Sequence, residues 1–383
     1  MFRSFITILS AGFAMFSMFF GSGNVVFPVL VGQVARNQSS YAIMGLMITA
    51  VLVPFLGLFS MFLFDGDYLK FFKRLGTIPA WFIVITIMSL IGPFGVIPRC
   101  VVISYSTVQT FWPTVNLFWF SLLSCFLIYF CSSNRSKIVD ILGIFLTPVL
   151  LFSLMVIIVK GLLSASPDTL DSMSKMKAFT FGLHEGYNMM DLFAAFMFSG
   201  IILKNMRRKF SNYKSKRKLL LLNLSASCIG VFLLGGVYAG MCFVSSSYST
   251  QLNNIPPAKI LSTLAVLVLG DCAGVVVCCA VALACLTTAI TLSVVFSEFI
   301  CKEVFFGKMH YRIGLIVTLV ISFFMSSLDF SGIQSYLVPF LVISLPCLML
   351  MTILNLSYKL LGFRPVKLPV FAVFILSCYF YFT

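Results

Sequence analysis

Charged residues are scarce in this chain of 383 residues. Only 10% are Asp, Glu, Lys or Arg, whereas a soluble domain carries about 25%. Hydrophobic residues make up 60% of the chain, and its mean hydropathy is +1.08. One soluble core cannot bury that much apolar surface, because single cores stop growing beyond about 250–300 residues. The composition therefore argues against a soluble enzyme or binding module and predicts a protein that lies in lipid.

Catalytic and metal-binding motifs are also missing. The only two histidines are His184 and His310, and His184-Glu185 lacks the second histidine of an HExxH motif. The twelve cysteines contain no CxxC pair and no Cys/His ligand spacing, so they are interpreted as small packing residues. No GxSxG elbow, coenzyme motif or filter-like channel repeat is present. The sequence predicts neither an enzyme nor a bound cofactor.

Acidic residues are few, 11 against 26 basic ones, which gives a net charge of +15. Such a charge can indicate nucleic-acid binding. Here the basic residues form short clusters between apolar runs, which is typical of cytoplasmic loops of membrane proteins. We therefore expect membrane lipid, and no nucleic acid, as a partner. The densest cluster, residues 204–218, is interpreted as an inside-retention signal, with specific binding of anionic lipid or a partner as the alternative.

Long apolar runs predict about eleven membrane spans, since about 20 residues cross a bilayer. The runs are 5–32, 41–63, 80–108, 116–131, 138–163, 182–203, 218–245, 273–299, 312–326, 333–357 and 367–383. Residues 258–270 are too short for a span and are expected to form an external or re-entrant helix. No A-x-A cleavage site follows the first run, which favours an interrupted span over a signal peptide.

Lys and Arg residues predict the orientation. With a cytoplasmic N-terminus, the inner segments hold 20 of them and the outer segments hold 5, while Arg99 lies within a span. This asymmetry follows the positive-inside rule and supports the span count.

Polar, glycine-containing breaks interrupt two of the spans. The residues concerned are Gly21, Ser22, Gly23 and Asn24 in span one, and Glu185, Gly186, Tyr187 and Asn188 in span six, with Asp191 just beyond. A glycine in a helix interior destabilises the helix by about 1 kcal/mol relative to alanine, and the asparagine side chain competes for backbone hydrogen bonds. A break within lipid persists only where protein encloses it or where it lines a cavity.

The two breaks lie five spans apart, so the second half of the chain has inverted topology. This predicts one all-α domain over residues 1–383, with inverted repeats at about 5–163 and 182–357 and an additional span at 367–383. Matched interruptions of this kind point to the binding site of a transporter. The alternative is that the glycines serve ordinary close helix packing.

Span eight carries a polar face made of Ala284, Thr287 and Thr288, which are spaced i, i+3 and i+4. Hydroxyl and carbonyl oxygens suit an alkali cation. Threonine hydroxyls can also bond to carbonyls of their own helix, and spacing alone favours that alternative.

Five segments in this order carry a family resemblance: FFGSGNVVFPVLVGQ, IGPFGVIPR, KIVDILGIFLTPVLL, FGLHEGYNMMDLFAAFMFSGII and LACLTTAI. They resemble the branched-chain amino acid:cation symporter (BrnQ-type) family of the amino acid–polyamine–organocation superfamily. The resemblance implies a LeuT-like fold of five plus five inverted spans with spans one and six broken. It also implies sodium-coupled uptake of leucine, isoleucine and valine across the bacterial cytoplasmic (inner) membrane. The family usually has twelve spans, whereas the apolar runs here predict about eleven, without the last.

The resemblance implies that Ala284, Thr287, Thr288 and a carbonyl near Ser22 bind sodium, which acts as the coupling ion. The substrate carboxylate is expected at the free amides of residues 22–24, because a half-helix starting there presents its positive dipole end. The ammonium group is expected at carbonyls freed near residues 185–188.

The remaining candidates carry open alternatives. The substrate side chain is expected against Phe27 and Met189 or Met190. Arg99 is a possible external gate or a side chain that snorkels to the interface. Glu185 could bind a cation, respond to a proton or cap the second half-helix, and Asp191 has a functional or a structural role. The alternative function is a proton-coupled permease of the same fold for another small neutral amino acid.

Overall fold

The computed structural model describes residues 2–133, 138–164, 173–209 and 216–382. Within these ranges all regular elements are helices, so the all-α prediction is confirmed. The α-helices are α1 (Phe2–Phe19), α2 (Ser22–Ala35), α3 (Ser39–Met47), α4 (Val53–Leu63), α5 (Tyr68–Phe72), α6 (Thr77–Ile91), α7 (Val96–Gln109), α8 (Leu117–Ser133), α9 (Ile138–Leu163), α10 (Lys175–Asn188), α11 (Asp191–Lys209), α12 (Lys216–Ser247), α13 (Ile260–Leu269), α14 (Asp271–Phe299), α15 (Tyr311–Ser326), α16 (Asp329–Leu361) and α17 (Lys367–Phe382).

Short irregular turns extend or join these helices. They are the 3₁₀ turns η1 (Arg36–Gln38), η3 (Lys73–Leu75) and η4 (Pro257–Lys259), and the π turns η2 (Ile48–Leu52) and η5 (Ile300–Val304). The π turn η2 joins α3 to α4, and η5 extends α14. The segment 258–270 forms the separate helix α13 with η4 before it, as expected, and Gly270 (φ 82°) divides it from α14.

Five helical stretches of the described residues are long and apolar enough to cross a membrane: 22–63, 77–109, 219–247, 271–304 and 329–361. The bent pair α10 and α11 makes a sixth. Six shorter apolar helices, of 10–17 residues, lie within the remaining predicted spans and in α13. The stretch 22–63 joins parts of predicted spans one and two, although Arg36 (φ 47°) ends α2 between them. The count of about eleven spans stays a prediction.

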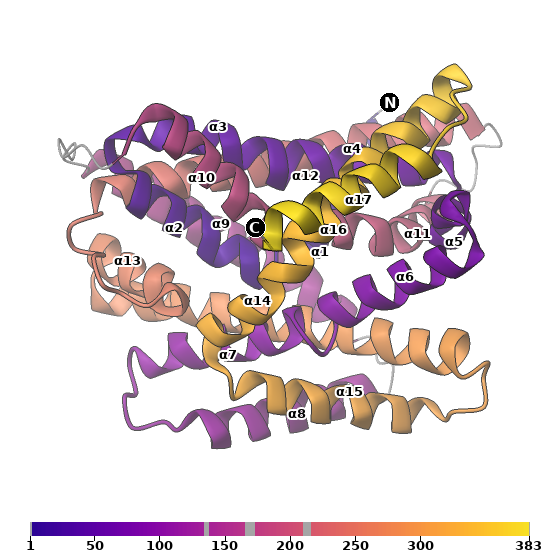
Figure 1. The fold of residues 1–383 in the computed structure, drawn as a ribbon. Helices are drawn as coiled ribbons and strands as arrows, with labels where there is room; N and C mark the ends of the chain where they lie inside the picture. The colour runs from indigo at the N-terminus through magenta and orange to yellow at the C-terminus, as the bar shows by residue number, and fades with distance from the viewer. Residues whose placement is uncertain (1, 134–137, 165–172, 210–215, 383) are drawn as a thin grey trace.

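Two groups of helices pack side by side (Figure 1). The first group, which we call the bundle, contains α1–α4 and α10–α12; in it α12 packs along α1 and α2, and α3 and α4 pack along α10 and α11. The second group, the scaffold, contains α7, α8, α14 and α15 at the bottom of Figure 1. The bundle thus unites spans one, two, six and seven, whereas the scaffold unites spans three, four, eight and nine.

Glycines allow the closest approaches inside the bundle. A Cβ atom on Gly32 of α2 would collide with the backbone of Cys242 in α12, and one on Gly182 of α10 would collide with the backbone of Ala42 in α3. Lipid tails are as apolar as the helix surfaces, so hydrophobic attraction does not drive helices together in a membrane, and close van der Waals packing contributes much of their association. Span one packs against span seven, and span six packs against span two. Inverted repeats require this, because spans one and six are equivalent in the two repeats, as are spans two and seven. The exact limits of the two repeats remain a prediction.

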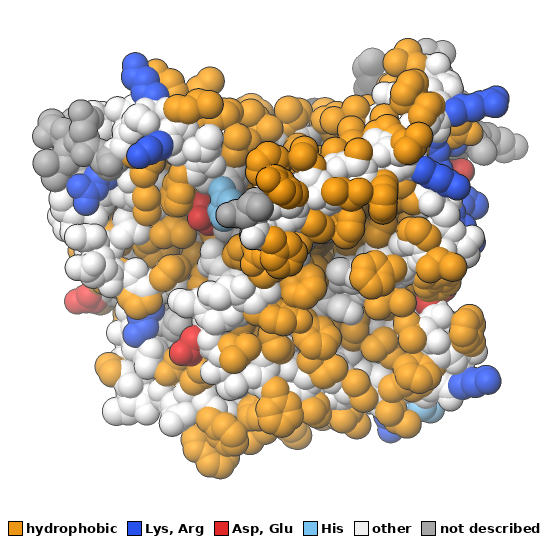
Figure 2. Space-filling model, in the orientation of Figure 1, with side chains coloured by type: hydrophobic (Ala, Val, Ile, Leu, Met, Phe, Trp, Pro, Cys, Tyr) orange, Lys and Arg blue, Asp and Glu red, His pale blue; other side chains and the backbone are white. Residues whose placement is uncertain are grey.

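The outer surface suits a lipid environment. Figure 2 shows hydrophobic side chains across the middle of the face, with Lys and Arg gathered towards its two ends. Large apolar side chains such as Phe232 and Leu163 are more than four-fifths exposed. A soluble monomer rarely exposes contiguous apolar surface beyond a few hundred Å², so this surface fits hydrocarbon.

Candidate functional site

The break in span one lies at Phe20 and Gly21, between α1 and α2. Gly21 is extended (φ −122°, ψ −162°), and its backbone N–H donates to Asn24 Oδ1 at 2.9 Å. The predicted break residues Ser22, Gly23 and Asn24 form the first turn of α2 instead. Their position matters because the first N–H groups of a helix have no partner within the helix. Span one therefore offers a helix N-terminus in the interior of the protein.

The break in span six comes later than predicted. Residues 185–188 were expected to interrupt the span, but they remain helical: α10 continues through Asn188, and the chain breaks at Met189 and Met190 (φ 62°) before α11 begins. The two half-helices are bent by 41°. Gly186 serves packing, since a Cβ atom there would collide with Thr49 Oγ1. Three of the carbonyls expected to be free, those of Gly186, Tyr187 and Asn188, already accept hydrogen bonds, from the backbone N–H groups of Met189 and Met190 and from Arg99.

A third break, in span three, was not predicted. Sequence analysis treated 80–108 as one uninterrupted span, but residues 92–95 separate α6 from α7. The sequence signal was there, because Gly92 and Pro93 are strong helix breakers. A Cβ atom on Gly95 would collide with the Leu90 carbonyl oxygen, so glycine is required at this turn. The break places Arg99 in the first turns of α7, where its backbone N–H donates to the Gly95 carbonyl at 3.1 Å.

The three breaks surround one central cavity. It encloses about 440 Å³ of space between atoms, part of it open to solvent. Its lining residues are Met18, Phe19, Gly21, Ser22, Gly23, Asn24, Ile91, Val96, Arg99, Met189, Met190, Asp191, Ala194, Phe198, Thr288 and Leu292. The walls are mostly apolar, and charged groups enter at only two of these positions, Arg99 and Asp191. The chemistry of this lining therefore suits a small molecule with an apolar body and a charged end.

Not every predicted site residue lines this cavity. Those outside its lining are Phe27, Glu185, Gly186, Tyr187, Asn188, Ala284 and Thr287. Gly186 and Tyr187 instead line a smaller neighbouring cavity that also touches Met190 and Asp191. Glu185 is buried and accepts from Asn188 Nδ2 at 2.9 Å, so it engages its own turn of α10.

Asp191, the first residue of α11, accepts hydrogen bonds only from neutral side chains in the part of the chain that the structure describes. Its side chain is buried, with 4% of the residue exposed. Asn24 Nδ2 donates to both carboxylate oxygens, at 3.2 and 2.9 Å, and the Tyr238 hydroxyl donates at 3.2 Å. Asn24 Nδ2 and Tyr238 Oη are themselves in contact. Sequence reasoning missed Tyr238, because α12 gives no local signal there; only packing against span one brings it in.

Arg99 is buried rather than at the membrane interface, so the snorkelling alternative is wrong. It is 1% exposed, and its Nη1 donates to the Asn188 carbonyl at 2.9 Å. Nε and Nη2 have no hydrogen-bond partner among the described residues. The guanidinium lies 5.6 Å from the ring centroids of both Phe27 and Phe330, whose rings are 6.1 Å apart. Phe27 thus lies near Arg99, although it does not itself line the cavity.

The span-eight hydroxyls bond to a carbonyl of their own helix, which is the alternative that spacing alone favoured. Thr287 and Thr288 both donate to the Ala284 carbonyl, at 2.9 and 3.0 Å. Their oxygen lone pairs are left to accept or to coordinate. Thr288 lines the cavity, and its Cγ2 lies 3.5 Å from a Cβ atom placed on Gly21. The Ser22 hydroxyl, also on the lining, is buried with no hydrogen-bond partner among the described residues.

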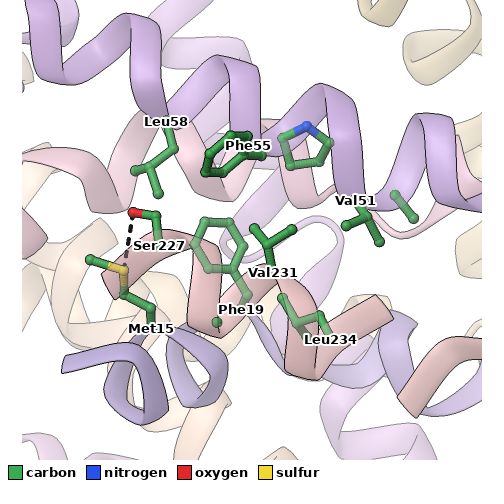
Figure 3. Close-up of a pocket in the computed structure, with 11 residues that line it drawn as sticks. Met15, Phe19, Val51, Phe55, Leu58, Ser227, Val231 and Leu234 are labelled. Atoms are coloured by element: carbon green, nitrogen blue, oxygen red, sulfur yellow. Dashed lines mark hydrogen bonds between the residues drawn. The ribbon is translucent and has the colours of Figure 1, made fainter. Parts of the chain in front are cut away.

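A second cavity, between α1, α4 and α12, has a different character (Figure 3). Apart from Ser227, its labelled side chains in Figure 3 are apolar. The Ser227 hydroxyl is already engaged, by Met15 Sδ at 3.3 Å and by the Asn223 carbonyl at 2.8 Å. A cavity without a charged or free polar group cannot compensate a buried zwitterion. The central cavity is the better candidate site.

A helical protein with broken spans around a central cavity has the architecture of LeuT-fold transporters, and comparison with solved structures agrees. The chain is similar to the inward-facing conformation of Mhp1, with a TM-score of 0.64 and 14% identity over 92% of this chain and 77% of that one. It is also similar to a manganese transporter from Eremococcus coleocola, with a TM-score of 0.62 and 14% identity over 96% and 84% of the two chains. The protein is thus a polytopic integral membrane protein with the LeuT fold.

The chain belongs to the branched-chain amino acid transport protein family, whose sequence profile matches residues 4–380. A protein named as a candidate branched-chain amino acid carrier in Staphylococcus haemolyticus (strain JCSC1435) is 28% identical over 96% of this chain and 86% of its own length. A protein of the same description in Staphylococcus aureus (strain USA300) is 27% identical with the same coverage. The family and the structural relatives are transporters rather than enzymes, which confirms that prediction.

Proposed function

We propose that this protein takes up leucine, isoleucine and valine together with sodium, by alternating access across the bacterial inner membrane, with its N-terminus in the cytoplasm. The observation that carries the proposal is the central cavity. It combines apolar walls, a helix N-terminus at membrane depth and a cluster of hydroxyl groups in a chain of the branched-chain amino acid transport family. The distribution of Lys and Arg supports the orientation.

The first turn of α2 suits the substrate carboxylate. Ser22, Gly23 and Asn24 line the cavity, and the backbone amides of a helix N-terminus attract anions through their free N–H groups and the helix dipole. The aliphatic side chain would lie against Met189, Met190 and Phe198, which also line the cavity. Phe27 is fully buried near Arg99 and does not line the cavity, so its part in the site would be to support that residue.

Sodium would bind between the span-one break and α14. Thr288 and the hydroxyl of Ser22 supply oxygen atoms on the cavity lining, while Thr287 and the Ala284 carbonyl belong to the same turn of α14. A cation needs such hard oxygen ligands. Because α1 and α2 belong to the bundle and α14 to the scaffold, a bound cation would tie the two groups together and favour one of their arrangements.

Arg99 fits the role of an outer gate. It extends from α7 of the scaffold to the paired rings of Phe27 of α2 and Phe330 of α16, and it donates to the carbonyl at the end of α10. With a cytoplasmic N-terminus, the start of α16 lies on the outer side. These contacts would then close the cavity towards the outside and would have to open before substrate enters.

A sodium gradient is expected to drive leucine accumulation in proteoliposomes. One charge that moves through 100 mV yields about 2.3 kcal/mol, which corresponds to about fifty-fold accumulation. Uptake of radiolabelled leucine should therefore be strong with an inward sodium gradient and fall to the level of empty liposomes when potassium or choline replaces sodium. Equal uptake in both conditions would overturn sodium coupling.

A proton-coupled permease for another small neutral amino acid is the second candidate. The observation in its favour is Asp191, a buried carboxylate with neutral donors only, since such a group can exchange a proton during transport. Leucine uptake by the same proteoliposomes, measured with an inward proton gradient and no sodium, separates the two candidates.

Leucine, isoleucine and valine are expected to compete with one another for uptake. A hydrophobic pocket distinguishes a single methylene by only about 1–3 kcal/mol, whereas burial of an unpaired side-chain charge costs far more. In competition assays, each of the three should inhibit uptake of the others, and lysine and glutamate should not inhibit at a hundredfold excess. Strong inhibition by either charged amino acid would refute the branched-chain assignment.

A further inference from the structure

The central cavity contains two buried charged side chains of opposite sign that form no ion pair. Arg99 and Asp191 both line it, and both are more than nine-tenths buried. In the described residues, neither has an oppositely charged partner within 4 Å. Glu185 attracts Arg99 from beyond that distance, but its carboxylate accepts from Asn188. Unpaired charges at membrane depth are costly and mark functional sites.

Arg99 has unused capacity to bind an anion. Only one of its nitrogens, Nη1, has a hydrogen-bond partner, whereas Nε and Nη2 have none among the described residues. A guanidinium presents its donors as a planar fork that matches a carboxylate bidentately. In this arrangement the bond to the Asn188 carbonyl and the two neighbouring phenyl rings orient the fork.

Asp191 has the complementary arrangement. Its carboxylate is oriented by Asn24 and Tyr238, which supply neutral donors and no positive charge. It opens the first turn of α11, three residues after the carbonyl that Arg99 holds. The two charges therefore lie near the same break of span six, one contributed by the bundle and the other by the scaffold.

We infer that Arg99 and Asp191 bind the two ends of the zwitterionic substrate, with Arg99 on the α-carboxylate and Asp191 on the α-ammonium. The inference rests on the proposed function and adds to it the side chains that recognise the amino-acid backbone. The substrate supplies each buried charge with its missing partner. Its carboxylate is then shared between the guanidinium and the free amides of α2. Asp191 supplies the ammonium with a full negative charge, which the carbonyls at the end of α10 cannot do.

Three ligands of similar shape test the pairing in the purified full-length protein. Leucine carries both charges, leucine amide lacks the carboxylate, and 4-methylpentanoate lacks the ammonium. We expect wild-type protein to bind leucine at least tenfold more tightly than either analogue, as measured by calorimetry or by competition with labelled leucine. Equal affinity for all three would overturn the inference without any variant. Absence of leucine binding to wild-type protein would instead overturn the proposed function, and the inference with it.

Variants assign each charge to its end of the substrate. Arg99→Gln should weaken leucine binding about 10- to 100-fold and leave the affinity for leucine amide unchanged, and Arg99→Lys should restore part of the loss. Asp191→Asn should weaken leucine binding to a similar extent and leave 4-methylpentanoate unchanged. Thr107→Ala in α7 and Ser199→Ala in α11 remove buried hydroxyls away from the cavity and should change nothing. A variant that weakens leucine and its matched analogue equally would reveal a structural role and refute the inference.

Discussion

Replacement of Gly23 by Val is expected to reduce leucine uptake to the background of empty vesicles. A Cβ atom on Gly23 would lie 3.0 Å from Met189 Cα and 3.2 Å from the Met189 carbonyl oxygen. Both are backbone atoms at the break of span six, which cannot move aside as a flexible side chain would. Valine adds two further methyl groups, so the N-terminus of α2 must separate from that break. Gly23→Ala, which needs a shift of only a few tenths of an ångström, should retain partial uptake.

Gly236→Ala is the matched control for this series. Gly236 lies in α12 of the same bundle, and a Cβ atom there meets nothing within 4 Å. Uptake of radiolabelled leucine should be normal in this variant, with expression and monodispersity measured for all variants. If Gly23→Val bound leucine with wild-type affinity, the contact between the two breaks could not be the substrate site.

The second large effect is expected on sodium dependence. Thr288→Ala should raise the sodium concentration for half-maximal leucine uptake about tenfold, because one ligand oxygen is lost; this corresponds to about 1.4 kcal/mol of binding free energy. Thr287→Ala should have a smaller effect, because Thr288 lines the cavity beside Gly21 whereas Thr287 does not. The measurement is initial uptake as a function of sodium concentration at saturating leucine.

Thr263→Ala serves as the control for the threonine variants. Thr263 lies in α13, outside the cavity lining, and its replacement should leave the sodium dependence unchanged. Wild-type sodium dependence in both span-eight variants would move the cation site elsewhere, and Glu185 and Asp191 would then be tested next.

The span-one break was predictable because its signal is local. Gly21 and Gly23 flank Ser22, and Asn24 follows. The low helix propensity of these residues predicts a break, and within a membrane the freed backbone groups must be enclosed by protein or line a cavity. The structure places the break at Phe20 and Gly21, so only Gly21 of the four predicted residues lies in it. Sequence analysis could also find the matching interruption five spans later, since repeats leave a periodic pattern.

The position of the span-six break could not be predicted in the same way. Gly186 carries the stronger helix-breaking signal, yet it stays helical. Thr49 of span two occupies the space that a side chain at this position would need. Met190, a good helix former, adopts φ 62° instead. Here tertiary packing overrides local propensity. Packing also decides whether a given glycine serves a close helix contact or lies in a turn.

The sequence by itself determined the environment, the helical class and the family, because apolar runs, the placement of Lys and Arg, and motif blocks are one-dimensional signals that lipid enforces directly. Only the tertiary structure decided which polar groups meet. Asn24 lies 167 residues from Asp191, and Arg99 lies 89 residues from the Asn188 carbonyl that it holds. No local pattern encodes such pairs, because they arise when half-helices from different spans pack around one cavity, and it is this packing that leaves two opposite charges there for a ligand to join.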